Sequence, residues 1–114
     1  MRSFDFFPAT KFDKYSIQRI LQAHVWQLEG LYHTGLNAQK IDTGNTQVVF
    51  GKLFIYLINE SKTEKFAYRI LPGGIFKIKI ENCHAIGRIT DIERNHVRFM
   101  IDYDSEGYIV DLVR

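Results

Sequence analysis

The feature that most constrains the fold is a series of short segments in which apolar and polar residues alternate. The clearest is IFKIKIE, residues 75–81, where apolar and charged side chains alternate from Phe76 onward. A period of two is typical of a strand with one face on a core and the other in solvent. Similar segments at 96–103 and 108–114 are separated by turn residues. Short connections favour antiparallel neighbours, so the chain predicts a β-meander.

One segment, residues 48–58, is apolar on both faces. With regular alternation Leu53 points to the core, and Phe54 and Tyr56 point away from it. A strand that is apolar on both faces is normally covered on both. We expect one long strand here, with Gly51 at a bulge or bend. Its outer face would then be buried by the rest of the chain or by a partner.

The stretch before this strand fits two structures. Asp13 or Ser16 can cap a helix over residues 13–23. Residues 24–33, HVWQLEGLYH, can continue that helix along the same apolar stripe, although Gly30 costs about 1 kcal/mol relative to alanine in a helix. They can also form a strand in which Trp26, Leu28 and Tyr32 share a face. The pattern alone leaves both structures open.

Composition favours a small β-rich domain. The chain has 114 residues, of which 46% are hydrophobic and 14% aromatic. Such a chain has room for one core, and its β-branched and aromatic residues favour strands. We predict a single domain, residues 1–114, with an aromatic tail (1–12), a helix (13–23) and a β-meander (24–114). The expected fold is mainly β, bordering on α+β, with six to seven antiparallel strands in a small barrel or strongly curved sheet.

Charge and cysteine content restrict partners and compartment. The net charge is +2, which is small for a protein that binds nucleic acid through phosphates, so nucleic acid is not favoured as a partner. Cys83 is the single cysteine and excludes an intrachain disulfide. A cytoplasmic location is favoured, and a periplasmic one is open if a signal peptide has been removed. No apolar run approaches the ~20 residues that span a bilayer.

No constellation of residues indicates catalysis or a metal. Cys83 and His84 are adjacent and point to opposite faces of a strand, and the histidines lack the close pairs typical of zinc sites. The acidic stretch 102–111 lacks the spacing of a calcium loop. We therefore predict a protein that is not an enzyme, with no cofactor and no metal site.

A family resemblance favours the strand at residues 24–33. A short helix followed by Leu21, Trp26, Leu28 and Gly30 resembles the opening of lipocalin-like bacterial barrels. In those barrels a Trp-x-Leu motif on the first strand plugs the closed end. The glycine that precedes the family's tryptophan is absent here. The alternative is a helix over residues 14–34 lying on a curved sheet.

The later part of the chain is similar to the same family. The likeness consists of Tyr68 to Ile70, the glycine pair at 73–74, and the segment from Ile86 to Thr90 before two closing strands. It implies a calycin-type barrel with an apolar interior that holds a small hydrophobic ligand.

Two functions follow as predictions. The first is a non-enzymatic binding protein whose pocket would be lined by an apolar inner face with a few polar anchors. Its candidate ligand-binding residues are Trp26, Tyr32, Ile55, Tyr68, Arg69, Phe76, Phe99 and Tyr108. The alternative is a protein-interaction module, such as an adaptor, an inhibitor or an immunity-type partner, or a homodimer. Its candidate contact residues are Phe4, Phe6 and Phe7 in the tail and Phe54 and Tyr56 on strand 48–58.

Overall fold

The computed structural model describes residues 13–35 and 39–114, which form a closed antiparallel barrel of eight strands with one additional strand and a short helix. The predicted contact residues Phe4, Phe6 and Phe7 lie outside the described residues. In chain order the elements are α2 (Lys14–Gln22), β1 (Val25–His33), β2 (Gln39–Lys40), β3 (Gln47–Phe50), β4 (Phe54–Ile58), β5 (Thr63–Leu71), β6 (Ile75–Ile80), β7 (Cys83–Ile92), β8 (His96–Tyr103) and β9 (Glu106–Val113).

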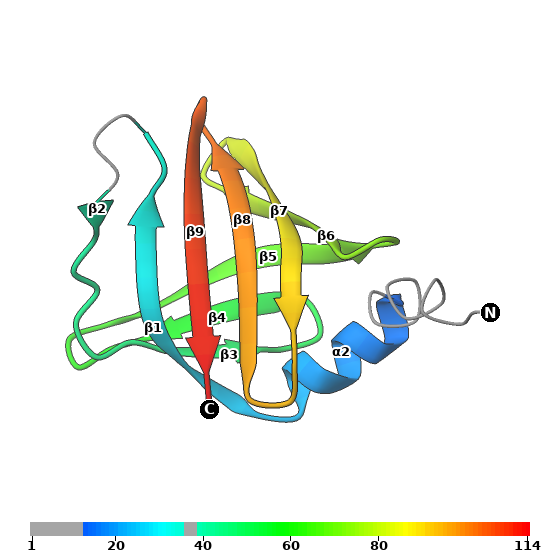
Figure 1. Cartoon of the computed structure of the whole chain (residues 1–114). Coiled ribbons are helices and arrows are strands. Elements are labelled where there is room, and N and C mark those ends of the chain that lie inside the picture. The colour runs from blue at the N-terminus through cyan, green and yellow to red at the C-terminus, as the bar shows by residue number, and fades with distance from the viewer. Residues whose placement is uncertain (1–12, 36–38) are drawn as a thin grey trace.

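Each barrel strand pairs with the next one along the chain, except that the short β2 lies at the edge of β1. The barrel closes because β9 pairs back onto β1 (Figure 1). Closure removes the open sheet edges that would otherwise offer unpaired backbone groups. The prediction of a mainly β fold with a small antiparallel barrel is confirmed.

The helix α2 begins where the sequence predicted. The Asp13 carboxylate accepts a hydrogen bond from the backbone N–H of Ser16, at 3.2 Å, and caps the first turn. Ile17 and Leu21 lie on one face and are fully buried. The helix lies at one end of the barrel (Figure 1), which we call the closed end.

Residues 24–33 form a strand rather than a continuation of the helix, so the alternative helix over 14–34 is wrong. β1 pairs with β3 through Val25–Gln27 and with β9 through Gln27–His33. The Trp26 side chain is fully buried, and its Nε1 donates a hydrogen bond to the carbonyl oxygen of Leu21 at 3.0 Å. Trp26 therefore joins the end of the helix to the floor of the barrel.

Segment 48–58 is a hairpin, so the predicted single long strand with a bulge or bend at Gly51 is wrong. β3 ends at Phe50 and β4 begins at Phe54, with Val48 opposite Leu57. In the turn, Gly51 N donates to the carbonyl oxygen of Phe54 at 2.8 Å. A Cβ on Gly51 would lie 3.2 Å from that oxygen, so the tight turn favours glycine. The reversal places Leu53 at the tip with 69% of its surface exposed, and not in the core.

This hairpin also corrects the strand count. Six to seven strands were expected, and splitting segment 48–58 raises the number in the barrel to eight. The two-residue β2 is an additional strand that pairs with the end of β1, outside this count. Two apolar faces on one segment were therefore the pattern of two paired strands joined by a turn.

A bulge in β1 changes which of its side chains point inward. Leu28 pairs with Leu112 and Gly30 pairs with Asp111, so the register shifts at Glu29. Past the bulge, Leu31 points into the barrel.

Tyr32 lies on the outer side, so the expectation that it shares the inner face with Trp26 and Leu28 is wrong. Its ring lies over Gly30, where a Cβ would come within 2.6 Å of the tyrosine ring. Opposite it on the neighbouring strand is Ile109.

Aromatic rings fill the barrel next to the closed end. Phe76 and Phe99 meet edge to face with centroids 5.1 Å apart, and Phe50 stacks on Phe99 at 6.3 Å. All three side chains are at most 5% exposed. Such offset and edge contacts are the arrangements that aromatic pairs favour. The rings form a packed layer above Trp26.

Tyr68 connects this layer to the β3–β4 turn. Its hydroxyl donates to the carbonyl oxygen of Gly51 at 2.6 Å, and Gln22 Nε2 donates to the same oxygen at 3.1 Å. Burial raises the pKa of Tyr68, an effect partly offset by the hydrogen bond from Gln22. The neutral phenol is thus the form that the fold stabilises.

We expect Tyr68→Phe to lower the free energy of unfolding by about 1 kcal/mol at neutral pH, the net value of one hydrogen bond. Because the folded-state pKa is raised, the contribution of Tyr68 is present below its ordinary pKa of about 10 and is lost as pH rises through the folded value. The phenylalanine variant should therefore lose less stability than the parent in alkali. Urea unfolding at several pH values measures both effects, and equal alkaline losses would contradict them.

Candidate functional site

The barrel contains a cavity of about 310 Å³. Every barrel strand except β7 contributes side chains to it, and its interior presents only apolar atoms. The volume is at the lower end of the range for small-molecule sites, roughly 300–1,000 Å³. The lining residues are Leu28, Leu31, Val48, Phe50, Ile55, Leu57, Phe66, Phe76, Ile78, Ile80, Phe99, Ile101, Tyr103, Tyr108, Val110 and Leu112.

Burial along the cavity wall shows which end is open. At the closed end the lining side chains of Phe50, Phe76 and Leu112 are buried, and α2 with Trp26 lies below them. At the other end the inward-facing Ile80 and Tyr103 are only half-buried. The cavity is therefore a pocket with an aromatic floor, and its mouth lies at the β6–β7 and β8–β9 turns.

Four of the eight candidate ligand-binding residues line this pocket: Ile55, Phe76, Phe99 and Tyr108. Each lies on the inward face that strand alternation predicted. Their position is settled by the structure, and their contact with a ligand stays a prediction.

The other four candidates lie elsewhere. Trp26 is below the floor, and Tyr68 turns its hydroxyl toward the β3–β4 turn. Tyr32 is outside because of the β1 bulge. Arg69 is exposed on the outer face of β5, between the buried Tyr68 and Ile70. Arg69 therefore does not supply a polar anchor inside the pocket.

Several lining residues were not among the candidates. Leu57, Ile80, Tyr103 and Val110 continue the inward alternation of their strands, so that periodicity could have identified them. Phe50 and Leu31 carry no such signal. Their direction depends on the β3–β4 turn and on the β1 bulge.

The mouth is acidic. Tyr103 lines the pocket near its mouth. Burial raises the pKa of Tyr103, and electrostatic interactions with Cys83, Glu81 and Asp104 raise it further. Glu106, the cross-strand partner of Tyr103, lies with its Oε1 2.5 Å from His33 Nε2. Glu81 and Asp104 both adopt positive φ angles, 55° and 54°, in the turns that form the rim.

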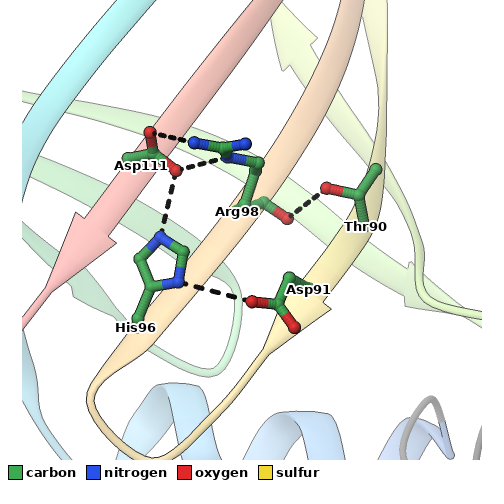
Figure 2. A network of polar contacts seen from close by, with 5 residues as sticks. All are labelled: Thr90, Asp91, His96, Arg98 and Asp111. Carbon is green, nitrogen blue, oxygen red and sulfur yellow. Dashed lines mark hydrogen bonds and ion pairs between the residues drawn. The ribbon is translucent and has the colours of Figure 1, made fainter.

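A second polar group lies on the outer face of β7–β9 (Figure 2). Arg98 donates two hydrogen bonds to Asp111, from Nε at 2.7 Å and from Nη2 at 2.9 Å. His96 bridges two carboxylates, with Nε2 3.1 Å from Asp111 and Nδ1 3.5 Å from Asp91. We call these four residues the ionic network. The hydrogen bond from Arg98 holds the pKa of Asp111 below its ordinary value, against the opposing effect of burial, and the bond from His96 adds to it.

The ionic network lies beside a group of side chains able to hold a cation. Ligand atoms of Asp91, Glu93 and His96 lie within 4.8 Å of one another at the β7–β8 turn. Asp91 and His96 already belong to the ionic network, and Glu93 is exposed. The sequence predicted no metal site. Because His96 contacts both Asp91 and Asp111, we assign this group the structural role of holding β7, β8 and β9 together.

We expect Asp111→Asn to lower the free energy of unfolding by about 1–2 kcal/mol at neutral pH. This is less than for a fully buried pair, because the Arg98 side chain is 47% exposed and water screens the charges. Since the folded-state pKa of Asp111 is lowered, its contribution is present above its ordinary pKa of about 4 and is lost as pH falls through the folded value. The difference in the free energy of unfolding between the variant and the parent should therefore become smaller in acid.

Chemical unfolding between about pH 7 and pH 2 checks this prediction, since the range spans the ordinary Asp pKa. Asp102→Asn is the matched control, because Asp102 is exposed on the same outer face of β8. An equal loss of stability in both variants would contradict a specific role for Asp111.

Comparison with known proteins gives no relative. No protein-family profile, no curated protein and no solved structure matches the chain. Within residues 13–35 and 39–114, no helix is long and apolar enough to cross a membrane. Function is therefore inferred from the pocket itself.

Proposed function

We propose that this protein is a non-enzymatic binding protein that holds one small hydrophobic molecule inside a lipocalin-like barrel. The observation that carries the proposal is the apolar pocket of about 310 Å³, open at one end and floored by aromatic rings at the other. The resemblance of the first helix and strand to lipocalin-like barrels supports the same function.

The energetics of the pocket favour an apolar occupant. Side chains that face an empty apolar space lose dispersion contacts, and a hydrocarbon ligand restores them. Moving apolar ligand surface out of water adds roughly 25 cal/mol per Å², or about 5 kcal/mol for 200 Å². A polar ligand would instead lose its hydrogen bonds to water without replacement in this interior.

Native mass spectrometry tests the proposal directly. Protein purified without detergent should carry an adduct that disappears under denaturing conditions, and the protein freed of it should bind the neutral fluorophore N-phenyl-1-naphthylamine with a blue-shifted emission. An adduct-free protein that also fails to bind the fluorophore would overturn the proposal.

A protein-interaction role is the second candidate. The observation that favours it is Leu53, which is 69% exposed at the tip of the β3–β4 hairpin. Phe54 and Tyr56 lie on the outer face beside it, half-buried, with their ring centroids 6.3 Å apart and Lys65 over the Phe54 ring. Sedimentation analysis of the parent and of Leu53→Ser tests self-association through this hairpin. A monomer in both cases would exclude a homodimer formed there.

A further inference from the structure

We propose that the mouth of the barrel selects against anionic ligands, so that the occupant is an uncharged or cationic amphiphile with a hydrocarbon body. This inference rests on the proposed function, since it assumes that the pocket binds a ligand. It concerns the chemical class of that ligand.

The interior determines where a polar head group must lie. The wall presents only apolar atoms, so no group inside the pocket can pair with a charge or accept a hydrogen bond. Burying an unpaired carboxylate in such surroundings is strongly unfavourable. A ligand with a head group therefore places its chain toward the aromatic floor and its head at the rim.

The rim carries negative charge at the point where the head group would lie. Glu81 in the β6–β7 turn and Asp104 in the β8–β9 turn both act electrostatically on Tyr103, which lines the pocket. Ile80 and Tyr103, which directly precede these two acids in the chain, line the pocket, so both acids lie at its rim; beside burial, both acids also raise the pKa of Tyr103. A carboxylate or phosphate head group would be repelled here, because these two exposed acids give the rim a negative potential.

The basic side chains near this rim do not offset the acids. His33 is paired with Glu106, at 2.5 Å, and its ring packs against Tyr108 with centroids 5.3 Å apart. Lys79 is exposed on the outer face of β6, and alternates with the inward-facing Ile78 and Ile80. His84, opposite Lys79, is also exposed. Lys62, in the β4–β5 turn at the same end of the barrel, lies 3.7 Å from Glu64 and is paired with it.

A set of ligands that share one chain and differ in the head group tests the inference. Dodecan-1-ol, dodecanoate and dodecyltrimethylammonium would compete with N-phenyl-1-naphthylamine, each below its micelle concentration, at about pH 8, where a carboxylic acid is ionised. In buffer of about 0.01 M ionic strength, where exposed charges are weakly screened, the alcohol and the ammonium should displace the fluorophore at concentrations at least about tenfold lower than dodecanoate.

Charge variants identify the source of the selection. The double variant Glu81→Gln with Asp104→Asn removes both rim charges, and asparagine tolerates the positive φ at 104. It should lower the ratio of the displacing concentration of dodecanoate to that of dodecan-1-ol by at least about threefold, with little change in the concentration needed for the alcohol. Glu93→Gln at the closed end is the matched control and should leave this ratio of concentrations unchanged.

Each outcome is decisive and separates the two proposals. If neither the fluorophore nor any dodecyl compound binds, the proposed function fails and this inference fails with it. If the alcohol and dodecanoate bind equally, or if dodecanoate binds more tightly, the pocket is a ligand site and the selection is refuted. If the selection is present but survives in the double variant, the rim acids are not its cause and the inference is overturned.

Discussion

Replacing Trp26 with alanine should lower the free energy of unfolding by about 3–5 kcal/mol, the range for deleting a large buried aromatic side chain. Trp26 is fully buried between the helix and the aromatic floor, next to Ile17 and Leu21. The substitution removes its packing and also the hydrogen bond that Nε1 donates to Leu21. Because a small domain has about 5–15 kcal/mol of stability in total, the loss is a large part of it.

Urea unfolding followed by far-ultraviolet circular dichroism measures this loss without relying on tryptophan fluorescence. Trp26→Phe keeps most of the packing but removes the hydrogen bond, so it should lose distinctly less. Tyr15→Ala changes a ring of the same helix that is 70% exposed, and should shift stability by at most about 0.5 kcal/mol. A Trp26→Ala variant as stable as Tyr15→Ala would refute the role of Trp26 in holding the helix to the barrel.

The second large effect concerns the pocket. Val110→Trp places a large ring in the space between the aromatic floor and the mouth, since Val110 lines the pocket and is only half-buried. We expect at least about a tenfold loss of affinity for N-phenyl-1-naphthylamine, because the ring occupies volume that the ligand needs. The fold should tolerate the change, because the added atoms enter existing space rather than a packed core.

Met100→Trp is the matched control for this variant. Met100 lies on the neighbouring strand β8, points outward and is 49% exposed, so the same ring is added outside the barrel. Fluorophore binding should be unchanged in it, and thermal unfolding should show both variants folded. Unchanged binding in a folded Val110→Trp would mean that the fluorophore does not occupy the pocket, and the proposed function would lose its main support.

The periodicity of the sequence predicted much of the barrel. Alternation in segments such as 75–81 and 96–103 identified strands and their inward faces, because one buried face imposes a period of two on any strand. The side chains of Phe76 and Phe99 were assigned inward on that ground and do line the pocket. The short helix was also predicted correctly, since its cap at Asp13 is a local interaction.

Interruptions of that periodicity could not be predicted. The turn at Gly51 and the bulge at Glu29 each reverse or shift the direction of the residues that follow, and neither carries a distinct local pattern. As a result Leu53 was assigned to the core and Tyr32 to the pocket. A glycine in an apolar run is compatible with a bulge or with a turn, and only the need to pair both halves as neighbouring strands distinguishes them.

The sequence by itself thus determined the class of fold, because strand periodicity and helix capping are local properties that residues close in the chain establish. Only the tertiary structure decided that the barrel closes through β9 and β1, that its interior is hollow toward one end, and that the turns carrying Glu81 and Asp104 lie at that same end. Those features depend on the registers of strands that are far apart in the chain, and the alternation within any one strand carries no information about them.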